Sequence, residues 1–391
     1  METESAVAPV IRRILVLRAG HIGDTVLVTP ALELLNQLFP GAEISALVRA
    51  GAEPILQHHP LVKRIFIGGE MFGCQKMLVG KKRPLWRRWL QAPRGIGLIR
   101  ELRRNRFDLA VDFNGGDRTA LLAFFSGAAR RIAYAATGSS LLFRDRLYTH
   151  LCRSPVQAKH KVLRDLELLC AVARATGREA LAGELVPGPT VMHCSPEALA
   201  WARRRWSMIG SGNRLRVLVH PTARAFYKCW AAEKWAALID RLRTEDVADV
   251  LVTSGPGPTD VAVARSVITS CQGKVPAHLG DLTLDRLAAL IRQANLFLGV
   301  DTAPMHIAAA VGTRVVAVFG PSCDQTWRPW GAGHCVVRCR CPCLETRQRG
   351  CEEAEGMRCL NAVTVEEVYE AAECALEELA GVEARATAVS R

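Results

Sequence analysis

Long apolar runs are missing from this sequence of 391 residues, and no stretch stays apolar over the length that crosses a bilayer. The start of the chain also lacks the charged-then-apolar pattern of a secretion signal. These two absences favour a cytoplasmic protein. Helix-turn-helix, zinc-finger and RNP patterns are missing as well, so the net charge of +13 at pH 7 does not indicate nucleic acid. We expect another anionic partner, either a membrane surface or a phosphorylated substrate.

The paired Cys-x-x-Cys spacing of a zinc ribbon is also absent, although the chain has 14 cysteines. Most of them stand singly in apolar surroundings, as reduced thiols of a core do. The segment 339–359 is different, because it gathers Cys339, Cys341, Cys343, Cys351 and Cys359. Thiolates at this spacing can form a structural metal site, and reduced thiols or a labile disulfide are the alternatives.

Short apolar runs alternate with helical patterns along the chain, which is the rhythm of a parallel α/β sheet. The clearest runs are 14–17, 44–48, 109–113, 217–219, 250–252 and 296–300. A stretch rich in Pro and Gly at 183–190 separates two similar halves. We predict two doubly wound domains, 1–188 and 189–391, with a cleft between them for a two-part substrate. A final helix at 365–379 should pack back on the body.

The strongest local pattern is strand, turn, helix and strand at 295–320. Asp301 or Thr302 should supply the N-cap oxygen, and Pro304 suits the first turn. The amino end of this helix would lie at the carboxyl edge of a parallel sheet, where α/β proteins bind phosphate. An ordinary capped crossover is the alternative, and His306 favours the binding site.

Two further turns follow strands of the first half. In one, Gly20 and Gly23 precede Asp24 at the entrance of a helix, where the backbone can approach a ligand closely. A simple N-cap is the alternative role for Asp24. In the other, Asn114 begins a glycine turn that leads to Arg118 and a second helix, so a ligand can bind there too.

Residues 76–106 contain eleven Lys and Arg residues against the single acidic residue Glu101. Trp86 and Trp89 are interleaved with these bases. Such a basic amphipathic element is typical of proteins that settle on an anionic lipid interface. We expect this segment to face a membrane, and a solvated helix face is the alternative.

Four motifs follow one another along nearly the whole chain. They are Arg18-x-x-x-Ile22-Gly23-Asp24 with Thr29-Pro30-Ala31, Lys228-x-Trp230 with Trp235, Ser254-Gly255-Pro256, and Gly299-Val300-Asp301-Thr302-Ala303-Pro304-x-His306. Their order and separations resemble glycosyltransferase family 9, the lipopolysaccharide heptosyltransferases. The glycine turn after Asp112, the strand Arg130-Arg131-Ile132 and the late cysteines are most similar to the heptosyltransferase III branch.

The resemblance implies the GT-B architecture, with two Rossmann-like domains that bind the acceptor (N-terminal) and the nucleotide-sugar donor (C-terminal). It implies inverting, metal-independent transfer of a heptose from ADP-heptose to an inner-core lipopolysaccharide or related glycolipid, without a cofactor, on the cytoplasmic face of the inner membrane. No Asp-x-Asp pair is present to hold a divalent ion on a diphosphate, which agrees with metal independence. The alternatives are a catalytically reduced binder of anionic lipid or glycan, and a family member that uses another nucleotide sugar.

The matching positions also imply roles for single residues. Asp24 corresponds to the general base that takes the acceptor proton, and Lys228 to the cation that binds the leaving phosphates. Arg18 either supports the acceptor or holds Asp24 in place. Acceptor binding further includes Gly23, Asn114 and Arg118. Donor binding further includes Thr222, Trp230, Ser254, Gly255, Leu282, Asp301, Thr302, Ala303 and His306.

Two features of the predicted donor site have a second interpretation or depart from the family pattern. Lys228 and Trp230 can also be a surface lysine beside a tryptophan that anchors a helix. Many members of the family that the chain resembles have an acidic residue shortly after the Gly-Pro turn, available to ribose hydroxyls, whereas this chain has Pro258 and only later Asp260.

Overall fold

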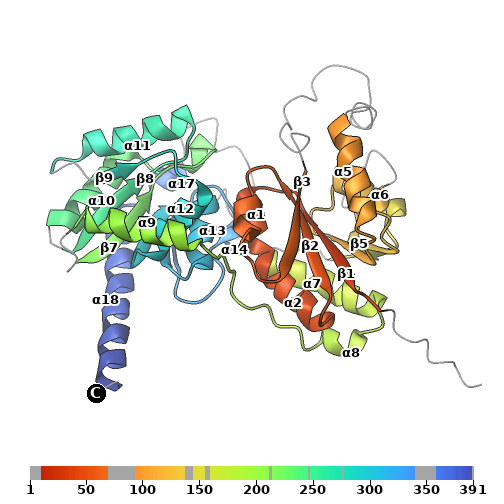
Figure 1. Cartoon of the computed structure of the whole chain (residues 1–391). Helices are drawn as coiled ribbons and strands as arrows, with labels where there is room; N and C mark the ends of the chain where they lie inside the picture. Colours follow the sequence, from red (N-terminus) through yellow and green to blue (C-terminus); the bar gives the residue numbers. More distant parts are fainter. Residues whose placement is uncertain are drawn as a thin grey trace, which may run out of the picture. The chain divides into compact units, whose positions relative to one another are not determined.

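The computed structural model describes residues 10–68, 93–136, 144–154, 159–210, 214–244, 247–273, 277–339 and 358–389. The chain divides into two compact units, Met1–Pro189 and Thr190–Arg391. Each unit contains a six-stranded parallel sheet flanked by helices (Figure 1). None of the helices in the described ranges is long and apolar enough to span a membrane.

The sheet of the first unit has the strand order β3-β2-β1-β4-β5-β6. Its strands are β1 (Arg13–Arg18), β2 (Glu43–Arg49), β3 (Val62–Gly68), β4 (Leu109–Asp112), β5 (Arg130–Tyr134) and β6 (His150–Cys152). The central strands are continuous apolar runs because helices cover both faces of the sheet. Leu15 of β1 pairs with Ser45 on one side and Ala110 on the other. The strand order reverses between β1 and β4, and ligands bind at such a switch point in doubly wound sheets.

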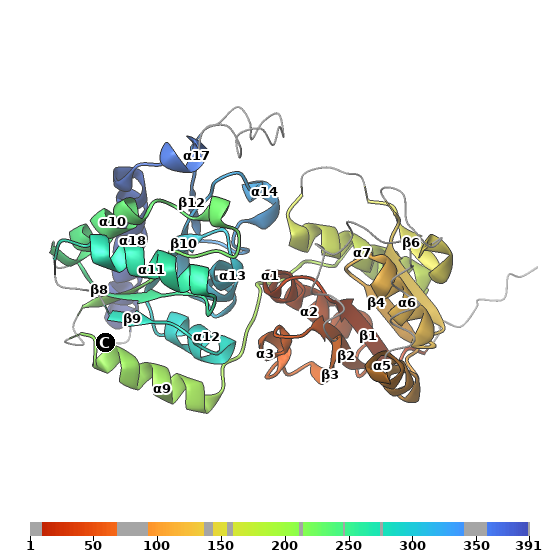
Figure 2. The same cartoon turned by 90° about the horizontal axis from the view of Figure 1, so that it is seen from above.

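The helices of the first unit are α1 (Ile22–Leu27), α2 (Thr29–Leu38), α3 (Glu53–Leu56), α5 (Pro93–Arg104), α6 (Asp117–Phe125), η3 (Arg144–Leu147), α7 (Lys161–Ala175) and α8 (Glu179–Ala182). The pairs α2 with α7 and α5 with α6 pack against each other (Figure 2). Leu15, Phe66 and Leu102 belong to the core between sheet and helices. Burial of this apolar surface is what holds the strand ends in place.

The sheet of the second unit has the order β12-β11-β10-β7-β8-β9. Its strands are β7 (Leu215–His220), β8 (Ala248–Thr253), β9 (Ala277–Leu279), β10 (Leu296–Val300), β11 (Arg314–Val318) and β12 (Cys335–Val337). Read in the opposite direction, this order repeats that of the first unit. The switch point of the second unit therefore lies between β7 and β10.

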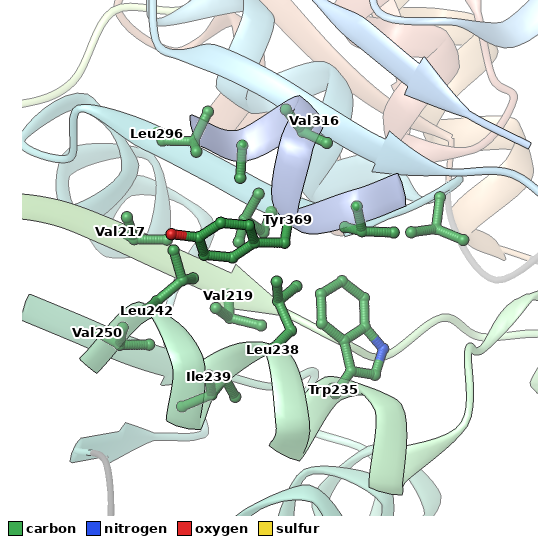
Figure 3. Close-up of a cluster of buried hydrophobic side chains, with 14 of the residues drawn as sticks. Val217, Val219, Trp235, Leu238, Ile239, Leu242, Val250, Leu296, Val316 and Tyr369 are labelled. Atoms are coloured by element: carbon green, nitrogen blue, oxygen red, sulfur yellow. The ribbon is translucent and has the colours of Figure 1, made fainter. Parts of the chain in front are cut away.

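The helices of the second unit are α9 (Pro196–Ser207), η4 (Phe226–Lys228), α10 (Ala232–Thr244), α11 (Pro258–Ser270), α12 (Leu284–Arg292), α13 (Ala303–Ala310), α14 (Asp324–Trp327), α17 (Arg358–Asn361) and α18 (Val365–Val389). The final helix α18 packs against α10. Figure 3 shows Tyr369 of α18 above Trp235 and Leu238 of α10, over the strands β7 and β10. Truncation of Trp235 to alanine should destabilise this unit by about 3–5 kcal/mol.

Candidate active site

Asp24 lies in the first turns of α1, just beyond the carboxyl end of β1. Its Oδ1 accepts a hydrogen bond of 3.0 Å from Arg18 Nη2, and its Oδ2 accepts one of 2.8 Å from the His21 amide. Gly20 makes room for this carboxylate, because a Cβ at Gly20 would lie 2.5 Å from Asp24 Oδ2. The glycine turn therefore serves to hold the carboxylate in one position.

Arg18 is buried, with 2% of its surface exposed. Besides the ion pair, its Nε donates to the backbone oxygen of Asp24 at 2.9 Å and its Nη1 donates to Phe113 O at 2.6 Å. The guanidinium thus ties the turn after β1 to the end of β4. Of the two roles expected for Arg18, holding Asp24 in place is the one seen in this geometry.

A pocket of about 220 Å³ opens beside Asp24 at the carboxyl ends of the strands. Its lining consists of Arg18, Gly20, Asp24, Phe113, Asn114, Tyr134, Lys161 and Arg164. Three of the four acceptor-side residues with a predicted side-chain role, Arg18, Asp24 and Asn114, are therefore brought together. Gly23 is buried within α1 and Arg118 is half-buried on α6, and neither belongs to the lining.

Lys161 and Arg164 are pocket residues that the sequence reasoning missed. Lys161 is buried and forms an ion pair with Asp165, one turn further along α7. The hydroxyl of Tyr134 lies 3.0 Å from Asp165 Oδ1 and 2.6 Å from the Arg164 carbonyl. The signal available in the sequence was this Lys and Asp pair among the apolar positions of an amphipathic helix.

The charges around Asp24 determine its protonation. Burial raises its pKa, but Arg18, the His21 amide and Lys161 together outweigh burial, so the pKa of Asp24 is below its usual value. Burial and Arg18 lower the pKa of Lys161 to about 8, against the opposite influence of Asp165 and Asp24. At neutral pH the pocket therefore contains an ionised Asp24 among cations.

Asn114 lies on a turn that the buried Asp112 side chain holds through hydrogen bonds. Asp112 Oδ1 accepts hydrogen bonds from the amides of Asn114 at 2.8 Å and Gly115 at 3.1 Å, and Tyr148 donates to Asp112 Oδ2 at 2.5 Å. Arg144 donates to the Gly115 carbonyl from the other side. Burial raises the pKa of Asp112, while these donors act in the opposite direction. Asp112 thus shapes the turn, and Asn114 is exposed at its tip.

In the second unit, Lys228 and Asp301 meet at the switch point. Lys228 ends η4, Asp301 follows β10, and Lys228 Nζ lies 2.6 Å from Asp301 Oδ2. The Asp301 side chain is 8% exposed and that of Lys228 is 26% exposed. The ammonium group is therefore reachable from solvent while its partner is largely buried.

The start of α13 differs from the expectation. Thr302 occupies the N-cap position, but its side chain makes no capping hydrogen bond, and the Asp301 carboxylate pairs with Lys228 instead. Because the Thr302 side chain does not cap this end, its amides and positive dipole are not shielded by the cap that we predicted. Thr302 and Ala303 are half-buried, whereas His306 is buried inside the helix packing.

The turn after β8 contains Ser254 and Gly255. Gly255 donates its amide to Thr222 Oγ1 at 3.3 Å, and Ser254 Oγ lies 3.3 Å from His278 Nε2. Thr222 is 1% exposed, so it supports this turn from inside the protein. A Cβ at Gly255 would lie 2.8 Å from Asp260 Oδ2, which shows that Asp260 reaches back to the turn. Asp260 comes later in the sequence than the acidic residue of many family members, but its carboxylate still lies at the turn.

Two predicted donor residues lie away from this group of side chains. Trp230 is buried in the core, with its ring centroid 5.1 Å from that of Trp235 and its Nε1 donating to Val363 O at 3.2 Å. It is the anchoring tryptophan of the alternative interpretation, and it fixes the segment that contains Lys228. Leu282 is half-buried in the loop before α12.

The cysteine segment is only partly within the described residues. Cys341, Cys343 and Cys351 fall outside them, and Cys359 is buried on α17. Within the described ranges, no group of three or more His, Cys, Asp or Glu residues is placed to hold a metal ion. The predicted structural metal site at 339–359 therefore stays a prediction.

Comparison with known proteins agrees with this arrangement. The model of glycosyltransferase family 9 (heptosyltransferase) matches residues 96–356. The chain is 31% identical over 309 residues to lipopolysaccharide heptosyltransferase 3 of Escherichia coli, which covers 79% of this chain and 83% of the relative.

Two solved structures share the fold. The family 9 glycosyltransferase of Veillonella parvula superposes with a TM-score of 0.77 and 20% identity, covering 94% of this chain and 98% of that one. The ADP-heptose lipopolysaccharide heptosyltransferase II of Escherichia coli superposes with a TM-score of 0.71 and 20% identity, covering 94% and 99%.

Two doubly wound parallel-sheet units, which these two solved structures share, place the chain in the GT-B fold class. The chain belongs to glycosyltransferase family 9, the heptosyltransferase family. The resemblance drawn from the four motifs is thereby confirmed.

Proposed function

We propose that this enzyme transfers a heptose from ADP-heptose to an inner-core lipopolysaccharide or related glycolipid acceptor. The observation that carries the proposal is the carboxylate of Asp24, ionised and held by Arg18 in a pocket at the carboxyl edge of the first sheet. The similarity to a lipopolysaccharide heptosyltransferase supports the acceptor class. The structural neighbour named for ADP-heptose supports the donor.

In this proposal Asp24 acts as the general base. It takes the proton of an acceptor hydroxyl while the hydroxyl oxygen attacks the anomeric carbon of the heptose. The bond from that carbon to the ADP oxygen breaks, and ADP leaves with the electron pair. Attack from the side opposite to ADP inverts the anomeric configuration.

The cations of the pocket favour an anionic acceptor. Arg18, Lys161 and Arg164 line the pocket, and Asp24 is the one acidic residue among the described residues of the lining. A phosphate or carboxylate on the core sugar would be attracted to this surface. The exposed amide of Asn114 can hydrogen-bond a neighbouring sugar hydroxyl.

The donor side uses charges that stabilise the departing diphosphate. Lys228 is partly exposed, and the start of α13 at Thr302 adds the positive end of a helix dipole. Ser254, Gly255 and the nearby carboxylate of Asp260 would receive the nucleotide, with Asp260 accepting hydrogen bonds from ribose hydroxyls. In this proposal these groups bind the nucleotide and stabilise the negative charge of its diphosphate without a resident metal. The proposal includes no cofactor.

We further propose that the enzyme works at the cytoplasmic face of the inner membrane. Residues 76–92 of the basic segment, with both tryptophans, lie outside the described residues. The described part is α5, which buries Leu102 and exposes Arg100, Arg103 and Arg104. Such a basic face would be attracted to anionic lipid.

The test is a donor panel assayed by ADP or UDP release with a purified inner-core acceptor. We expect release from ADP-heptose, an inverted product anomer by NMR, and full activity in excess EDTA. Release from another nucleotide sugar alone would identify a family member with a different donor. Binding of acceptor or anionic vesicles without any release would identify the catalytically reduced binder.

A further inference from the structure

One buried histidine joins the carboxyl ends of β7 and β8. His220 Nδ1 lies 3.0 Å from Thr253 Oγ1, and His220 Nε2 lies 3.1 Å from Thr222 Oγ1. Thr222 Oγ1 accepts the amide hydrogen of Gly255 at 3.3 Å. The hydrogen bonds thus connect the last residue of β7 with the glycine turn after β8.

The protons in this series of hydrogen bonds can be assigned by counting donors. Thr253 has one hydroxyl proton and donates it to Val219 O at 3.4 Å, so its oxygen accepts from His220. The ring proton is then on Nδ1, and Nε2 accepts the hydroxyl proton of Thr222. Thr222 in turn keeps a lone pair for the Gly255 amide. Each bond then has one direction, and the bond from the Thr222 hydroxyl to Nε2 requires the neutral ring.

The surroundings keep His220 neutral and close to its neighbours. The side chain is 3% exposed, and burial lowers its pKa to about 4. An imidazolium would have no acceptor for the Thr222 hydroxyl. The neighbouring strand also approaches closely, since a Cβ at Gly299 would lie 3.1 Å from the His220 carbonyl oxygen.

We propose that His220 is a positioning residue for donor binding, which holds the turn at 254–257 through Thr222 and Gly255. His220 touches no ligand in this account. It acts by fixing the amide of Gly255 and the adjoining Ser254, toward which Asp260 also reaches. The inference rests on the proposed function, because it takes the donor nucleotide to bind this turn.

The test compares Thr222→Val, Thr222→Ser and His220→Leu. Thr222→Val keeps the shape of the side chain but removes the hydroxyl, so it interrupts the chain even if His220→Leu does not fold. We expect the ADP dissociation constant and the donor KM to rise about tenfold in Thr222→Val and His220→Leu, the effect of one lost buried hydrogen bond. The kcat and the acceptor KM should stay within about threefold, and Thr222→Ser should restore the donor KM.

His334→Leu is the matched control. His334 also has a pKa lowered to about 4 by burial, but it precedes the amino end of β12, whereas His220 ends β7 at the opposite end of the strands. Loss of this imidazole should leave ADP affinity unchanged. An equal loss of affinity in His334→Leu would overturn the inference, because removal of an imidazole at the opposite end of the strands would then have the same effect.

Hydrogen exchange at the Gly255 amide supplies a reading that needs no ligand. We expect faster exchange in Thr222→Val and His220→Leu and wild-type exchange in His334→Leu. Wild-type exchange in Thr222→Val would overturn the hydrogen-bond order, and fast exchange with wild-type ADP affinity would overturn the positioning role. If the wild-type protein neither binds ADP nor releases it from ADP-heptose, the proposed function fails instead, and the positioning role of His220 in donor binding fails with it.

Discussion

Lys228 and Asp301 form an ion pair of 2.6 Å that links η4 to the carboxyl end of β10. The lysine expected to bind the diphosphate is thus already held by an aspartate of the same site. A bound phosphate has to share Lys228 with Asp301, so the two side chains should affect donor binding in opposite directions.

We expect Lys228→Ala to lower both ADP affinity and kcat, each by about 10- to 100-fold, because phosphate charge grows as ADP departs. Asp301→Asn removes the competing charge, and ADP affinity should rise about threefold to tenfold. Calorimetry and initial rates measure both effects. Lys234→Ala is the control, since this lysine donates to the carbonyls of Asn361 and Val363. Wild-type ADP affinity in Lys228→Ala would place the diphosphate elsewhere.

Gly20 is expected to be essential for a steric reason. A methyl group there would meet the Asp24 carboxylate at 2.5 Å, so Gly20→Ala should displace the base and lower kcat by at least about tenfold. The fold should survive, as judged by thermal unfolding. Gly97→Ala in α5 is the control, because a Cβ there meets no atom within 4 Å. Full activity in Gly20→Ala would show that the position of Asp24 does not limit the rate.

The pH dependence follows from the lowered pKa of Asp24. Because its pKa is lowered, Asp24 is ionised throughout the range from about pH 5 to 8. Protonation of Asp24 should therefore cause no loss of kcat/KM in that range. In Arg18→Gln burial still raises the pKa but the guanidinium no longer lowers it, so an acidic limb should appear at higher pH. An Arg18→Gln profile that coincides with the wild-type profile would contradict this assignment.

The same shift affects stability with a defined sign. A carboxyl whose pKa is lower in the folded state binds fewer protons there, so it stabilises the fold above its unfolded pKa of about 3.9. That contribution is lost as the pH falls through the folded pKa. Acid unfolding of Asp24→Asn should lack this component, which urea titrations at several pH values can measure.

The basic face of α5 gives a prediction for membrane binding. Arg103→Gln with Arg104→Gln should weaken binding to anionic vesicles on the order of 30-fold, at about 1 kcal/mol for each base, and added salt should weaken wild-type binding. Arg203→Gln with Arg204→Gln removes two exposed arginines of α9 as the control. If vesicle binding changes neither with salt nor with the α5 substitutions, the membrane interpretation is wrong and α5 has a solvated basic face.

Much of the fold could be predicted because its central strands are apolar runs with two buried faces. The apolar run predicted at 296–300 has the same bounds as β10, and the run at 250–252 lies within β8. It missed the edge strands β6, β9 and β12, each only three residues long, because so short a run has no clear period. The predicted helix after Asp24 is divided into α1 and α2 at Val28.

Site residues that belong to a sequence motif could be predicted. Residues that reach the site only through tertiary packing could not. Asp24, Lys228 and Asp301 stand in motifs, and the structure places each at a switch point. Lys161 reaches the pocket only because α7 packs beside α2, far from it in sequence. The sequence left two roles open for Trp230, because its partner Val363 lies on a distant segment.

The most direct test of the central claim is the rate of ADP release from ADP-heptose by Asp24→Asn with an inner-core acceptor. The amide keeps the shape of the carboxylate but cannot take the acceptor proton. We predict a kcat about 10²- to 10⁴-fold below wild type, with the fold and ADP affinity nearly intact. Wild-type turnover in Asp24→Asn would contradict the role of Asp24 as the general base.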